Sequence, residues 1–176
     1  EIPKLMQNYV LLFRGINVGG NNKLPMKELK ALLVKLGYQG VQSYIQSGNI
    51  ILRAETLELS AIKQAISDSR GFTPEILALT QKQLTTAIEN NPYPQAEGKT
   101  VHFYFCQQSP KFNNDKALSL KKDSEAYTLI DKVMYLHAPE GIGRPKLAAK
   151  MEHCLGVNAT ARNLNTALKI QARVKS

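Results

Sequence analysis

The chain has 176 residues, of which 43% are hydrophobic, and its 23 Lys and Arg against 14 Asp and Glu give a formal net charge of +9. These proportions exclude a disordered, a collagen-like and a coiled-coil protein, and a chain of this length forms one compact domain or two small ones. The longest apolar runs, such as residues 9–13, are far shorter than the roughly 20 residues that cross a bilayer, and no signal peptide opens the chain. The sequence therefore predicts a cytoplasmic protein without a membrane partner.

Cysteine and histidine do not predict a metal site. The two cysteines of the chain, Cys106 and Cys154, are far apart and form no C-x-x-C motif, which fits a reducing compartment. His102 and Cys106 are four residues apart on one expected strand, a separation of roughly 13 Å that a single ion does not bridge. His153 and Cys154 are adjacent on an expected helix and point in different directions. We therefore expect no metal and no cofactor.

Six elements are predicted in the first half of the chain, and they alternate as strand, helix, strand, strand, helix, strand. Apolar runs and helical spacing place them at residues 9–13, 25–36, 41–46, 50–53, 57–69 and 75–79. Gly48 lies between the expected strands at residues 41–46 and 50–53, and it can take the positive φ of a tight hairpin turn. This order is the split βαβ arrangement of ferredoxin-like domains.

A linking helix is expected next. Thr80 and Gln83 have the spacing of a capping box, Leu84 and Ala87 lie on one face of the helix, and the helix ends near Asn91. The loop of residues 92–99 is the predicted boundary between two halves.

The same order recurs in the second half. The expected strands and helices lie at residues 101–106, 114–120, 125–130, 133–137, 145–155, 157–160 and 163–174. In the long amphipathic helix, Leu147, Met151 and Leu155 share one face, and Gly156 ends it. The predicted fold class is therefore α+β, with two ferredoxin-like halves in tandem, residues 6–91 and residues 100–176, and a C-terminal helix.

Three stretches carry a family resemblance: residues 14–20 (RGINVGG), residues 44–49 (YIQSGN) and residues 159–163 (ATARN), the last followed by Thr166. Together they resemble the bacterial family called domain of unknown function 1697, over nearly the whole chain from Met6. The resemblance implies the same pair of ferredoxin-like subdomains, and it implies no activity. Relatives often carry an aromatic residue after the Arg-Asn pair, where this chain has Leu164, which weakens the case for a stacking role at that position.

The loop between the first strand and the first helix is a candidate anion site. Backbone N–H groups of Gly19 and Gly20 and the following helix N-terminus can receive an anion, to which Arg14 adds a bidentate contact and Lys23 a point charge. The loop has neither the G-x-x-x-x-G-K-[ST] nor the G-x-G-x-x-G pattern. The alternative is a sharp structural loop in which Asn17 bonds to its own backbone, and for phosphate this interpretation is favoured.

Ser47 and Asn49 flank Gly48 at the predicted hairpin turn. A serine on a tight turn can act as a nucleophile when a base and an oxyanion donor are close. The sequence shows no base or oxyanion donor in a recognisable relation to Ser47, and the flanking glycines of G-x-S-x-G are absent. A structural turn is therefore the favoured interpretation.

Positive charge is concentrated near the end of the sequence. Residues 141–176 hold seven basic residues and one acidic residue, which accounts for +6 of the total +9. On the expected helices these cations form two rows, Lys146, Lys150 and His153 in the first and Arg162, Thr166, Lys169 and Arg173 in the second. Two such rows on neighbouring helices suit a phosphate-rich partner. The segment has no Phe, Tyr or Trp on which a base stacks, so a merely solvated basic face is the competing interpretation.

Three hypotheses about function remain open. The preferred one is a binding module for an anionic partner, a phosphate-bearing ligand or nucleic acid, that uses Arg14, Lys23, Arg144, Lys146, Arg162 and Lys169. The second is an enzyme for a small polar metabolite in a cleft between the halves, lined by Arg14, Asn17, Ser47, Asn49, Arg162 and Asn163. The third is a purely structural or protein-interaction role. Its strongest support is that Arg162 can be an internal clamp whose guanidinium holds carbonyl groups of the other half.

Overall fold

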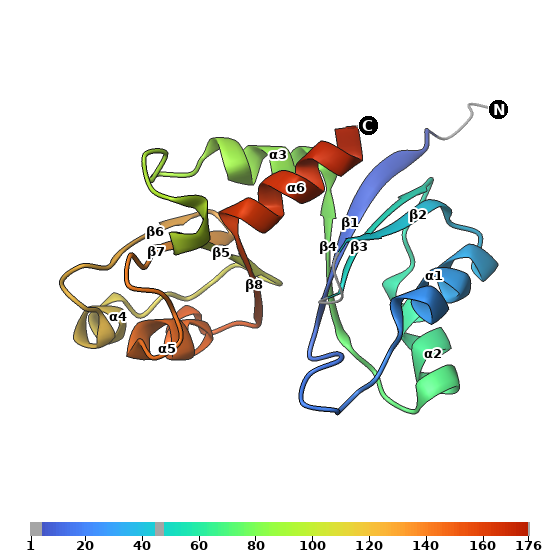
Figure 1. The fold of residues 1–176 in the computed structure, drawn as a ribbon, viewed down its shortest axis with the longest axis horizontal. Helices are drawn as coiled ribbons and strands as arrows, with labels where there is room; N and C mark the ends of the chain where they lie inside the picture. Colours follow the sequence, from blue (N-terminus) through green and yellow to red (C-terminus); the bar gives the residue numbers. More distant parts are fainter. Residues whose placement is uncertain (1–4, 45–47, 176) are drawn as a thin grey trace. The chain divides into compact units, whose positions relative to one another are not determined.

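The computed structural model describes residues 5–44 and 48–175 (Figure 1). The chain divides into two compact units, the first comprising Glu1–Thr85 with Ile170–Ser176 and the second comprising Thr86–Lys169. Within the described residues, every helix is too short or too polar to span a membrane.

The first unit is a four-stranded antiparallel sheet with two helices. Its elements are β1 (Gln7–Arg14), α1 (Met26–Lys35), β2 (Gln39–Tyr44), β3 (Asn49–Ala54), α2 (Leu59–Arg70) and β4 (Glu75–Thr80). The strands lie in the order β2-β3-β1-β4, and all three neighbouring pairs are antiparallel. This is the split βαβ topology, so the predicted fold of the first half is confirmed.

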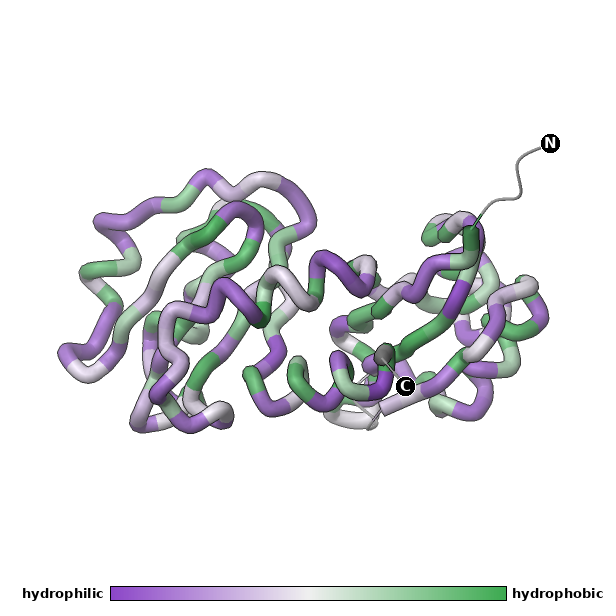
Figure 2. The backbone as a smooth tube through the Cα atoms, turned by 90° about the horizontal axis from the view of Figure 1, so that it is seen from above, coloured by the Kyte–Doolittle hydropathy of each residue, from purple (hydrophilic) through white to green (hydrophobic). Residues whose placement is uncertain are grey.

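Alternation along the strands explains how this sheet is covered. Leu11 and Phe13 on β1 join the core that α1 and α2 complete, whereas Val10 and Leu12 point to the opposite face and are also buried. Pro25 is the N-cap residue of α1, a position at which a missing backbone N–H removes no hydrogen bond of the helix. Figure 2 shows hydrophobic segments interrupted by hydrophilic ones along the chain, the pattern of amphipathic helices and two-faced strands.

The second unit repeats this topology. Its elements are β5 (Val101–Cys106), α4 (Asn114–Leu120), β6 (Ala126–Ile130), β7 (Val133–His137), α5 (Lys146–Leu155) and β8 (Ala159–Asn163), preceded by a 3₁₀ turn at Gly98–Thr100. The sheet order is β6-β7-β5-β8, again antiparallel throughout. The α+β class with two ferredoxin-like halves is thus confirmed.

The last strand differs from its predicted range of residues 157–160. Pairing of β8 with β5 begins at Ala159 opposite Cys106 and continues to Asn163 opposite His102. The sequence pattern ended the strand early because Arg162 and Asn163 are polar. An edge strand tolerates such residues, since only one of its sides pairs with a neighbour.

Two helices, α3 (Gln81–Glu89) and α6 (Leu164–Lys175), contribute residues to both units. The capping box at the start of α3 is formed as predicted. The backbone N–H of Thr80 donates to Gln83 Oε1 at 2.9 Å, and the N–H of Gln83 donates to Thr80 Oγ1 at 3.1 Å. The two compact units divide within these helices, at Thr85/Thr86 in α3 and at Lys169/Ile170 in α6. The sequence pattern instead predicts a boundary in the loop of residues 92–99.

Side-chain contacts explain this division. The hydroxyl of Tyr135 on β7 donates to the carbonyl of Ala87 at 2.6 Å, which ties the end of α3 to the second unit. Gln171 Nε2 donates to Thr85 Oγ1 at 3.2 Å within the first unit. The guanidinium of Arg173 lies 4.8 Å from the ring centroid of Tyr44, a cation–π contact that ties the end of α6 to the first unit.

Substitution of Gly48 tests how closely the β2–β3 hairpin packs against the core of the first unit. The φ of Gly48 is +86°, and a Cβ there would lie 2.7 Å from Phe13 Cβ, whereas Gly71 has a φ of +78° with open space around it. We expect Gly48→Ala to lower the free energy of unfolding by about 3 kcal/mol and Gly71→Ala by about 1 kcal/mol, because only the first adds a clash to the backbone strain. Urea unfolding measures both, and equal losses would contradict the close packing.

Candidate functional site

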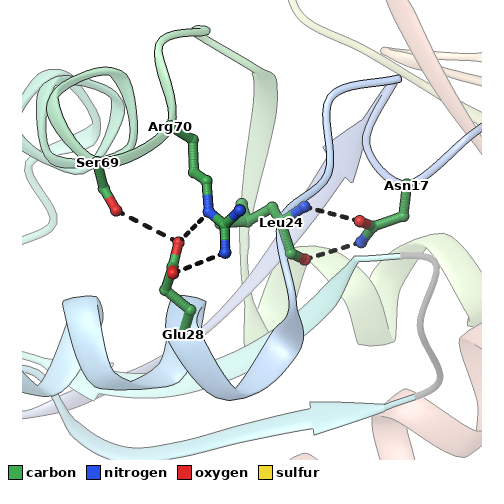
Figure 3. A network of polar contacts seen from close by, with 5 residues as sticks. All are labelled: Asn17, Leu24, Glu28, Ser69 and Arg70. Carbon is green, nitrogen blue, oxygen red and sulfur yellow. Dashed lines mark hydrogen bonds and ion pairs between the residues drawn. The ribbon is translucent and has the colours of Figure 1, made fainter. Parts of the chain in front are cut away.

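The loop between β1 and α1 is held by Asn17 (Figure 3). Its Nδ2 donates to the carbonyl of Leu24 at 2.9 Å, and its Oδ1 accepts from the N–H of Leu24 at 2.7 Å. The backbone N–H of Asn17 also donates to the carbonyl of Asn22 at 3.1 Å. Asn17 therefore closes the loop across seven residues, so its expected bond to its own local backbone turn is wrong in detail, although its role is structural.

The glycines of this loop form a hairpin-like tip. Gly19 and Gly20 are exposed with φ of +60° and +76°, and the N–H of Asn21 donates to the carbonyl of Val18 at 3.0 Å. The loop thus uses its N–H groups at Asn17 and Asn21 for its own closure. Arg14 and Lys23 stand exposed at its two ends.

A carboxylate already occupies the first turn of α1. Glu28 accepts from Arg70 Nε at 2.5 Å and from Arg70 Nη2 at 2.8 Å, and the Ser69 hydroxyl donates to the same carboxylate at 3.3 Å (Figure 3). The hydrogen bond from Arg70 holds the pKa of Glu28 below its ordinary value. Glu28 lies in the first turn of α1, the helix start at which a phosphate was expected, and its negative charge does not favour a second anion there.

The second motif is also structural where the structure describes it. Asn49 is fully buried, and its Nδ2 donates to the carbonyl of Tyr44 at 3.2 Å across the β2–β3 hairpin. The N–H of Phe13 donates to the carbonyl of Gly48 at 2.8 Å. Ser47 lies outside the described residues.

The third motif starts α6. Asn163 Oδ1 accepts from the N–H of Thr166 at 2.9 Å, the geometry of an N-cap. Arg162 lies on β8 opposite Phe103, and its Nη1 donates to the carbonyl of Ala161 at 2.8 Å. Burial lowers the pKa of Arg162 to about 10, which leaves the guanidinium charged at neutral pH. Because Arg162 precedes the helix, the expected row Arg162, Thr166, Lys169, Arg173 does not exist as one helical face.

The predicted row on α5 is present. Lys146, Lys150 and His153 are exposed, opposite the buried stripe of Leu147, Met151 and Leu155, and Arg144 is exposed just before the helix. The acidic residue of α5, Glu152, accepts the N–H of Ala159 at 3.1 Å and so faces the start of β8. Across residues 5–44 and 48–175, Arg144, Lys146 and Lys150 have no carboxylate within ion-pair distance.

The two basic helices do not share one face. Helix α5 packs with α4 against the core of Tyr104 and Met134, and Figure 1 shows the start of α6 on the other side of the second sheet. Lys169 is exposed in the second unit, and Arg173 stacks on Tyr44 in the first. The expectation of two rows on neighbouring helices is therefore corrected to a single row on α5.

The fold also redistributes the net charge. The first unit holds twelve Lys and Arg against six Asp and Glu, and the second holds eleven against eight. The first unit is thus the more basic one, at +6 against +3, partly because the end of α6 belongs to it.

The first unit also has a groove whose lining residues the sequence patterns did not indicate as a site. This groove of about 260 Å³ is lined by Asn8, Gly40, Gln42, Ile51, Arg53 and Arg173, with Val174 beside them. The available signal was the alternation of Ile51 and Arg53 on β3 and of Asn8 and Val10 on β1, which places polar side chains on one end of the face away from α1 and α2. Arg173 could not be assigned to this groove, because 120 residues separate it from Arg53.

His102 on β5 is a buried titratable group of the second unit. It is 7% exposed, and its Nε2 has no hydrogen-bond partner among the described residues. Desolvation lowers its pKa from the ordinary value of 6.5. No group of three His, Cys, Asp or Glu in the described part of the chain is placed to bind a metal ion.

Asn17→Asp tests whether Asn17 acts as a clamp. The change removes the N–H donor to the buried Leu24 carbonyl and sets a negative charge beside it, so we expect a loss of about 2 kcal/mol in unfolding free energy. Asn21→Asp adds the same charge to the exposed tip and should cost less than about 0.5 kcal/mol. Urea denaturation separates the two, and equal stabilities would refute the clamp.

His102 predicts a pH dependence of stability. Since its folded pKa is depressed, the unfolded state binds the proton more readily, and stability falls as pH drops through about 6.5. The slope attributable to this residue is at most about 1.4 kcal/mol per pH unit, the value for uptake of one proton on unfolding. Urea unfolding between about pH 7 and about pH 5.5 should show this slope in the wild type and in His153→Gln, and lose it in His102→Gln; an unchanged slope in His102→Gln would exclude the assignment.

The comparisons with known proteins agree with the fold. The conserved bacterial protein SP0830 from Streptococcus pneumoniae has a similar structure, with a TM-score of 0.70 and 24% sequence identity over 97% of this chain and 99% of that one. At this identity the likeness concerns the fold alone. No curated protein matches the sequence. Residues 6–135 match the sequence family described as Protein of unknown function (DUF1697), a range that contains the motifs at residues 14–20 and 44–49 and ends before the one at residues 159–163. The expected resemblance is confirmed, and the chain belongs to this family.

Proposed function

We propose that this protein is a binding module for an anionic partner, and that the partner is nucleic acid contacted through its phosphates. The observation that carries the proposal is the exposed row on α5. Arg144, Lys146 and Lys150 face solvent without an ion pair among the described residues, and Glu152 is engaged with the start of β8.

The spacing and chemistry of this row suit phosphate contacts. Lys146 and Lys150 are one helical turn apart, about 6 Å along the axis, and each offers a flexible point charge. The outer face of α5 presents no Phe, Tyr or Trp on which a base could stack. We therefore expect binding to the backbone with little sequence preference and with a strong dependence on salt.

The enzyme hypothesis has less support from the geometry. It relied on polar side chains of the three motifs, and the amides of Asn17, Asn49 and Asn163 each satisfy backbone groups within their own unit. Such amides hold a turn or a helix start and are not available to a substrate in this arrangement.

Removal of the α5 charges tests the proposal. Fluorescence anisotropy of a labelled short DNA duplex, measured over a series of NaCl concentrations, gives the slope of log K against log salt. With Lys146 and Lys150 both changed to Gln, the slope should become shallower by about 1.8, because each phosphate contact contributes about 0.9.

A matched control removes the same charge from the first unit. Lys27 and Lys82 are exposed and have no carboxylate partner in the described part of the chain. The double variant Lys27→Gln/Lys82→Gln should leave the slope close to that of the wild type. Equal effects of both double variants would show that only net charge matters, and a salt-independent wild type would overturn the proposal.

A further inference from the structure

The groove in the first unit is distinct from α5 and has its own chemistry. It lies on the face of the sheet opposite α1 and α2, since Ile51 and Arg53 alternate with Ile50 and Leu52, which join the helical core. Ile51 on the sheet and Val174 on α6 provide its apolar part. Its volume of about 260 Å³ is below that of most pockets for larger cofactors, so it suits a small ligand group.

Arg53 is placed in the groove by an irregularity of the neighbouring strand. The pairing of β2 with β3 shifts register between Gln39 and Gln42, and Gly40 within this bulge has a φ of +59°. A Cβ at Gly40 would lie 3.2 Å from Arg53 Nε, so the glycine leaves room for the guanidinium to rest against the strand. The guanidinium of Arg53 has no hydrogen bond or ion pair to any residue that the structure describes.

Arg173 brings a second guanidinium from a different element. It comes from the end of α6 and lies over the Tyr44 ring, a contact that restricts where its charge can be. None of the described residues that line the groove is an Asp or a Glu. An anion bound between the two guanidinium groups would be attracted by both.

Two amides complete the set of polar groups. Asn8 Nδ2 donates to Gln81 Oε1 at 3.0 Å, which fixes the orientation of the Asn8 side chain. The side-chain amide of Gln42 lines the groove without a hydrogen-bond partner among the described residues. A guanidinium fork matches the oxygen pairs of phosphate and carboxylate, and an amide N–H₂ adds a further donor.

We infer that this groove binds the phosphate or carboxylate group of a small molecule between Arg53 and Arg173. The site is independent of the proposed nucleic-acid surface on α5, because the two share no residue. Its position at the meeting of the sheet with the end of α6 means that a ligand would also fasten that helix end to the first unit.

The test is a titration of ¹⁵N-labelled full-length protein with inorganic phosphate and, separately, with acetate, at constant ionic strength set by NaCl. Backbone amide shifts at Gln42, Ile51 and Arg53 should saturate with at least one of the two anions, and the one that binds more tightly identifies the ligand group. Arg53→Gln and Arg173→Gln should each raise the dissociation constant at least about tenfold, and Arg53→Lys should have a smaller effect because it keeps the charge and loses the fork.

Arg144→Gln is the matched control, because it removes one arginine charge from the second unit, and it should leave these shifts unchanged. Conversely, Arg53→Gln should keep the salt slope for duplex DNA at the wild-type value, so failure of one proposal does not imply failure of the other. The inference is overturned if neither anion gives saturable shifts in the groove, or if Arg53→Gln binds phosphate and acetate as the wild type does.

Discussion

Each four-stranded sheet in this protein is apolar on both faces, and the split βαβ topology supplies helices for only one of them. In the first unit Val10, Leu12 and Leu77 are buried on the face away from α1 and α2. In the second unit Phe103 and Tyr135 are buried on the face away from α4 and α5, where their rings meet edge to face at 4.8 Å. Burial of such side chains contributes about 1.5–3 kcal/mol each, so a second covering layer is required.

Helices α3 and α6 answer this requirement, which explains why the compact units divide inside them. Tyr135 bonds to the end of α3, and Arg173 and Gln171 bind the end of α6 to the first unit. The same arrangement creates the groove, because Arg173 reaches the sheet only where α6 ends upon it. Architecture and the inferred anion site therefore have a common origin.

The three motifs that carry the family resemblance are, in their described residues, parts of the architecture. Asn17 closes a loop, Asn49 closes a hairpin, and Asn163 caps a helix, each through its side-chain amide or carbonyl. At Asn17 the amide donates and accepts at once, whereas a carboxylate of the same shape only accepts. The cations that remain for binding lie elsewhere, on α5 and in the groove of the first unit.

Local patterns in the sequence were sufficient for most of the fold. Apolar alternation, the capping box at Thr80 and Gln83, and the turn at Gly48 determine strands and helices through contacts a few residues apart. The candidate binding surfaces could not be predicted as well from local patterns, because they depend on which side of a sheet each helix covers. Only the tertiary structure decided that α5 and the start of α6 lie on opposite sides of the second sheet, that Glu28 pairs with Arg70, and that Arg53 and Arg173 line one groove. Charge acts through space, and the distances between charges are set by packing between segments that are remote in the chain.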